Sequence, residues 1–76
     1  MLFLIDYDRK TGRTLQFLTY QDADRVQAED RRLEIELDLN RRGLLMEREV
    51  VLLGAASEQA VRKTHERYFM SMPLPA

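Results

Sequence analysis

Residues 1–20 read MLFLIDYDRKTGRTLQFLTY, and they predict a β-hairpin. The segments 2–8 and 13–20 are rich in large apolar and aromatic residues, and they alternate as half-buried strands do. The polar residues between them suit a three-residue loop at 10–12, in which Gly12 adopts the left-handed conformation of a bulged turn. The rest of the fold is therefore built onto this hairpin.

The loop also predicts which residues of the two strands face each other. With Arg9 opposite Arg13, both sides of the hairpin carry apolar side chains near its open end. The opposed pairs are Tyr7–Leu15, Ile5–Phe17 and Phe3–Thr19 on one side, and Asp6–Gln16, Leu4–Leu18 and Leu2–Tyr20 on the other.

Residues 22–42 predict a long helix that begins with Asp22 as N-cap and stops at Gly43. The apolar–polar alternation over 33–39 also fits a strand, but Asp and Glu are poor strand residues, so we prefer the helix. Such a helix has two apolar stripes on nearly opposite sides, and we expect the first to face the sheet. The stripes are Ala23, Val26, Leu33 and Leu37, and then Ala28, Ile35 and Leu39.

Residues 48–54, REVVLLG, predict a third strand that is apolar on both faces, as in a strand covered on both sides. Residues 57–69 predict a second helix capped by Ser57. Its inward stripe is Val61, Thr64, His65 and Tyr68. Two prolines keep residues 71–76 from continuing this helix, so we expect one domain over 1–70 followed by a flexible tail.

These elements predict an α+β fold of order β-β-α-β-α. A right-handed crossover from the second strand to the third leaves a slot between them for the first. The expected sheet has three strands in the order 2-1-3, with the first antiparallel to both neighbours. We classify this split β-α-β arrangement as mixed. We expect both helices to pack on one face of it.

Composition limits the classes of function. The chain has 76 residues, no cysteine, one histidine and a net charge of −1, so it lacks the basic excess typical of nucleic-acid binding. No stretch is long and apolar enough to be a signal peptide or a membrane span, and we expect a cytoplasmic protein without a cofactor. A domain this small needs extra stabilisation, and without disulfides the expected source is oligomerisation.

Two clusters could carry chemistry. Asp6 and Asp8 share one side of a strand end, where paired carboxylates could hold a divalent cation in a nuclease-like site. The simpler interpretation, which we prefer, is a strand that runs out into a turn. His65 lies beside Tyr68 on the last helix, with Arg62 close by, which could form a ligand pocket or a general base. A partly buried structural histidine is the simpler interpretation there.

The sequence favours a small non-enzymatic interaction or regulatory module, because no motif assembles a nucleophile, a base and an oxyanion donor. The alternative is a nucleic-acid-binding or metal-dependent nuclease-like protein that uses Asp6 and Asp8 or the turn holding Arg62, His65 and Arg67. If both helices cover one sheet face, the other face stays apolar and open, which predicts a homodimer. The expected interface is Leu2, Leu4, Leu18, Tyr20, Ile35 and Leu39.

Overall fold

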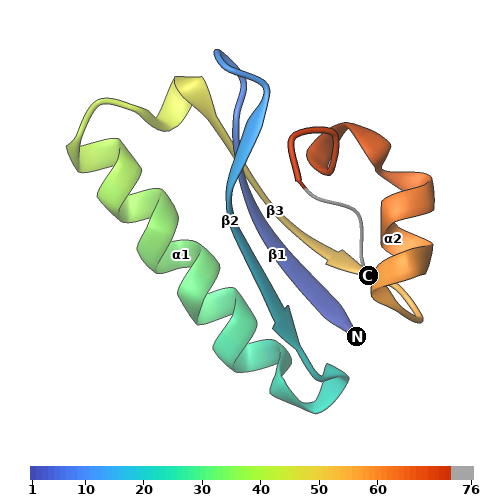
Figure 1. Cartoon of the computed structure of the whole chain (residues 1–76). Coiled ribbons are helices and arrows are strands. Elements are labelled where there is room, and N and C mark those ends of the chain that lie inside the picture. The colour runs from blue at the N-terminus through green and yellow to red at the C-terminus, as the bar shows by residue number, and fades with distance from the viewer. Residues whose placement is uncertain (73–76) are drawn as a thin grey trace.

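The computed structural model describes residues 1–72, and its chain order is strand, strand, helix, strand, helix (Figure 1). Of the tail predicted at 71–76, residues 73–76 lie outside the described part. The main elements are β1 (Leu2–Asp8), β2 (Arg13–Tyr20), α1 (Arg25–Arg41), β3 (Arg48–Gly54) and α2 (Glu58–Thr64). Short 3₁₀ turns are η1 (Asp22–Asp24), η2 (Leu45–Glu47) and η3 (Glu66–Tyr68).

The three strands form one sheet in the predicted order, β2-β1-β3. β1 runs antiparallel to both of its neighbours, as predicted. Every pair of neighbouring strands is therefore antiparallel, and the classification of the sheet as mixed is wrong. Strands β2 and β3 run in the same direction, but they never touch, since β1 lies between them (Figure 1). Each edge of the sheet is therefore formed by a different strand.

The hairpin register is confirmed from its open end to Asp6, which pairs with Gln16. Beyond that point the register shifts, and Tyr7 pairs with Thr14 rather than with the predicted Leu15. The loop closes one residue earlier than expected, because Gly12 donates its N–H to the carbonyl of residue 8 at 2.8 Å. Gly12 has the predicted positive φ of 72°. The additional residue in β2 forms a bulge.

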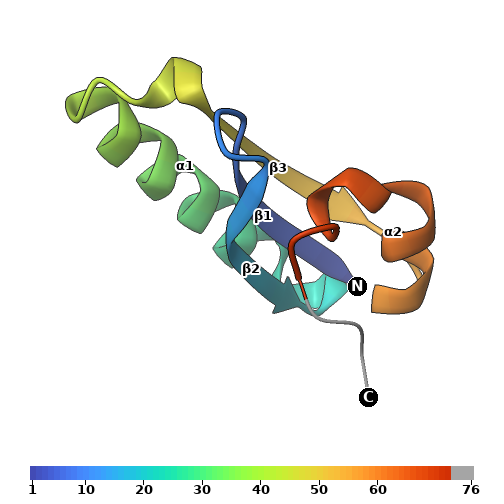
Figure 2. The same ribbon diagram turned by 45° about the horizontal axis from the view of Figure 1, so that its top comes forward.

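The two helices lie on opposite faces of the sheet, so the prediction of one shared face is wrong. Figures 1 and 2 show α1 on one side of the strands, and α2 with η3 on the other. Leu4 packs against α1, whereas Phe3 and Ile5 pack against α2 and η3. The physical reason is that the strands are apolar on both faces, and each face needs its own cover.

The stripe of α1 that meets the sheet is the second one. Ala28, Ile35 and Leu39 are buried, while Val26 and Leu33 on the opposite stripe are 74% and 56% exposed. Ala28 is fully covered, and a small side chain at this position lets the helix approach the sheet closely. The helix itself and its end are confirmed, since Gly43 has a φ of 71°. The predicted N-cap at Asp22 is wrong, because Asp22 lies in η1 and α1 begins at Arg25 without a side-chain cap.

The C-terminal helix is shorter than predicted. Ser57 caps α2 by accepting the N–H of Ala60 at 3.1 Å, as expected, but the helix stops at Thr64. His65 leaves the helical conformation with ψ 51°, and η3 follows. Consequently Val61 is buried but Thr64 is exposed. Within residues 1–72, no helix has the length and apolar character needed to cross a bilayer.

Candidate interaction surface at the edge of the sheet

Asp6 and Asp8, the predicted metal-binding pair, lie in different surroundings. Asp6 is 2% exposed, and its Oδ2 accepts a hydrogen bond of 2.7 Å from Nη1 of Arg48. Asp8 lies in the hairpin turn, where a hydrogen bond of 2.9 Å from the N–H of Lys10 lowers the pKa of its carboxyl group. Among residues 1–72, no group of three or more His, Asp or Glu side chains is arranged to hold a metal ion.

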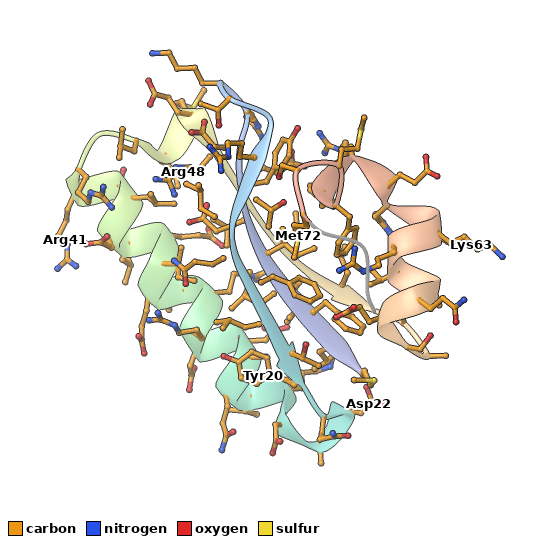
Figure 3. The ribbon with its side chains drawn as sticks, in the orientation of Figure 1. Tyr20, Asp22, Arg41, Arg48, Lys63 and Met72 are labelled. Carbon is orange, nitrogen blue, oxygen red and sulfur yellow. The ribbon has the colours of Figure 1, made fainter. Side chains whose placement is uncertain are left out.

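A groove of about 570 Å³ lies above Asp6, between α1 and the adjacent strands. Arg48 reaches into this region from β3 and lies between α1 and the sheet (Figure 3). The other arginines that line the groove are paired with carboxylates of α1, for example Arg31 with Glu34 at 3.0 Å. Oδ1 of Asp6 has no partner among the described residues. The groove thus combines one buried ion pair with several exposed ones.

Of the three residues proposed as a ligand site, His65 and Tyr68 contact each other, whereas Arg62 has other partners. The ring of His65 stacks on Tyr68 with centroids 6.1 Å apart, and its Nδ1 lies 2.9 Å from the hydroxyl of Thr64. Arg62 instead bonds Glu58 at 3.1 Å and lies over the ring of Phe69. The histidine and the arginine therefore serve separate local contacts.

Tyr68 belongs to a network that links η3 to β3. Its hydroxyl donates to Oε1 of Glu49 at 2.7 Å, and Arg67 also bonds this carboxylate. Burial raises the pKa of Tyr68, and its hydrogen bond to Glu49 raises it further. Burial of Glu49 opposes ionisation, yet the hydrogen bonds from Tyr68 and Arg67 outweigh it and lower the pKa of Glu49.

The side chains expected to form a dimer interface lie under the chain's own helix. Leu4 and Ile35 are 0% and 6% exposed, and they pack together between the sheet and α1. The other four assigned residues are Leu2 and Leu39, which are also buried, and Leu18 and Tyr20, which are partly buried. The sheet face on which the dimer prediction relied is therefore already covered by α1.

What remains open are the two edges of the sheet. At the β2 edge, the bulge pushes Leu15 outward to 48% exposure and breaks the regular ladder. The N–H of Thr14 is taken by the hydroxyl of Ser71 at 3.3 Å. Bulges and covering segments are the usual devices that prevent pairing at an edge. The β2 edge is thus interrupted at its end next to the hairpin turn.

The β3 edge has neither device. Its register with β1 is unbroken, and its four central residues, Val50 to Leu53, are all apolar and only partly buried. No proline and no bulge interrupts it, and its charged residues, Arg48 and Glu49, are confined to one end. An apolar, regular edge strand is a template for pairing with another strand.

The pairing of β3 with β1 determines which backbone N–H and C=O groups of β3 point towards β1 and which point away from the sheet. Met1 and Ala55 exchange both main-chain hydrogen bonds, at 3.0 Å each. Because these groups alternate in direction along an antiparallel strand, Val51 directs its N–H and C=O towards β1. Val50 and Leu52 then direct theirs away from the sheet. Apart from the ladder itself, no backbone hydrogen bond within residues 1–72 involves either of these two residues.

Sequence reasoning named none of this edge as a site. The signal was present, because the predicted order 2-1-3 already places residues 48–54 at an edge. Their apolar character was instead interpreted as that of a strand covered on both sides. Comparisons of the chain with protein-family models, with curated proteins and with solved structures found no match.

Proposed function

We propose that this protein is a small non-enzymatic interaction module that binds an extended segment by strand addition along β3. The observation that carries the proposal is the asymmetry of the two sheet edges. One edge is interrupted near the hairpin turn by the bulge at Leu15 and by Ser71, whereas the other presents an uninterrupted apolar strand. In strand addition the main-chain hydrogen bonds supply affinity, and the alternating side chains supply selectivity.

The surroundings of β3 support this mode of binding. Val50 and Leu52 contact the core beneath α1, and Val51 contacts the core beneath α2. The strand is therefore supported by one helical layer on each of its two faces. An added strand would place its alternate side chains against the flanks of these two layers and extend both cores.

A peptide probe tests the proposal. We expect an acetylated and amidated peptide of alternating valine and threonine, with terminal lysines, to shift the amide resonances of Val50 and Leu52. Val50→Pro removes one outward N–H and should abolish the shifts without breaking a bond to β1. Thr19→Pro is the matched control, because by the same alternation Thr19 directs its N–H away from β1 at the opposite edge.

Two results would count against strand addition at β3. One is a set of shifts confined to β2 or α1, and the other is unchanged binding by Val50→Pro when its circular dichroism shows a folded chain. Should Val50→Pro fail to fold, Leu52→Lys provides the second variant. A lysine on an edge strand opposes pairing, so weakened peptide binding is expected there as well.

A further inference from the structure

We infer that the segment bound along β3 carries a basic residue, lysine or arginine, opposite Val50, and that Glu36 of α1 recognises this residue. The inference rests on the proposed function and adds the chemistry of its partner. Two features of the structure support it, namely a surface hollow at the free edge of β3 and the state of the charged groups around that hollow.

The hollow determines the position of the basic residue. It has a volume of about 380 Å³, and Val50 and Val51 line it together with Glu36 of α1 and Leu45 of η2. Val50 and Val51 point to opposite faces of the sheet, so a hollow that touches both lies at the edge of the strand. An added strand would therefore run through the hollow. Its residue opposite Val50 would point to the same face as Val50, which is the α1 side.

Leu45 provides an apolar wall on this side of the hollow. Its side chain is 40% exposed, and the neighbouring Val50 is only partly buried. Lysine and arginine have long methylene stems that cover apolar surface while the charged head stays in water. A basic side chain opposite Val50 would thus cover Leu45 with its stem and bring its charge to Glu36.

Glu36 is able to accept a further cation. Among residues 1–72 it forms one ion pair, with Arg32, in which Nε lies 3.5 Å from Oε1 and both side chains are 40% exposed. A carboxylate has two oxygens and accepts several hydrogen bonds. Because the pair with Arg32 is long and solvated, it leaves room for an incoming ammonium or guanidinium group.

The other charged groups at the hollow already contact partners within the chain. Arg9 and Arg67 both contact the carboxylate of Glu49. Arg48 donates a hydrogen bond of 2.7 Å to the buried Asp6. An acidic residue opposite Val50 would therefore face a carboxylate and meet arginines that are already paired, whereas a basic residue gains an ion pair.

Titration of three peptides, followed by the amide resonances of Val50 and Leu52, tests the inference. The peptides share the acetylated and amidated sequence Ser-Thr-Val-X-Val-Thr-Ser, in which X is lysine, norleucine or glutamate. This sequence is the same in both directions and has no charge outside X, so strand orientation and terminal charge do not affect the comparison. We expect the lysine peptide to bind about threefold more tightly than the norleucine peptide and about tenfold more tightly than the glutamate peptide.

Glu36→Gln should abolish the preference for lysine over norleucine and leave the affinity for the norleucine peptide unchanged. Glu34→Gln is the matched control, because it also loses one helical ion pair, with Arg31, but lies on the β2 side and should keep the preference. Equal affinity for the three peptides, tightest binding of norleucine, or a preference that persists in Glu36→Gln would overturn the inference and leave strand addition intact. Unshifted resonances of Val50 and Leu52 with every peptide would overturn both.

Discussion

Removal of one partner of the buried Asp6–Arg48 pair should destabilise the fold severely. Asp6 is 2% exposed, and its carboxylate accepts its one hydrogen bond, at 2.7 Å, from Arg48. Arg48→Met would leave a buried negative charge without any partner among the described residues. Loss of one member of such a pair costs about 3–5 kcal/mol, against a total stability of roughly 4–11 kcal/mol for a domain of this size.

Urea denaturation followed by circular dichroism, at one fixed protein concentration, measures this loss. Arg42→Met is the control, since its ion pair with Asp38 at 3.3 Å is about half exposed, and we expect a loss of roughly 0.5 kcal/mol. The double variant Asp6→Leu with Arg48→Met removes both charges and should recover most of the lost stability. A loss below about 1 kcal/mol for Arg48→Met would refute the view that this pair is buried and isolated from water.

Three further variants test the core, the helix cap and the network at β3. Phe3→Ala removes a fully buried ring that stacks on Phe17, and thermal unfolding should show a loss of about 3–5 kcal/mol. Ser57→Ala removes the side-chain cap of α2 and should cost about 1 kcal/mol in the same assay. Tyr68→Phe should cost about 1 kcal/mol at pH 7, since it removes a hydrogen bond to Glu49. The pKa of Glu49 is lowered in the folded chain, so the stabilisation that its carboxylate provides is present above its ordinary pKa of 4.5 and is lost as the pH falls through the lowered pKa. Tyr68→Phe should therefore also make the loss of stability below about pH 4.5 less steep.

Local patterns predicted the elements, because each rested on residues close in sequence, and the handedness of the crossover then predicted the strand order. Gly12 marked the hairpin turn, Ser57 marked the start of α2, and both take the expected conformations. The hairpin register was correct up to Asp6, where the pairing depends on alternation alone. The shift beyond it comes from hydrogen bonds inside the turn, and composition does not reveal those.

The arrangement of the layers could not be obtained in the same way. Two apolar stripes on α1 were recognised, but helical periodicity does not say which stripe meets the sheet. The choice depends on how closely Ala28 lets the helix approach and on which sheet face is free, and both are tertiary properties. The assumption that one face held both helices then misplaced the dimer surface. With α1 and α2 on opposite faces, an apolar sheet is open at its edge rather than on its face.

Hydrogen exchange of the β3 amides tests most directly whether this edge is paired. Val51 and Leu53 bond to β1 within the chain, so their amides should exchange slowly at every protein concentration. Val50 and Leu52 should exchange faster than these two in the free chain, and as slowly as these two when the valine–threonine peptide is added in excess. Exchange of Val50 and Leu52 that an excess of the peptide does not slow would contradict strand addition at β3.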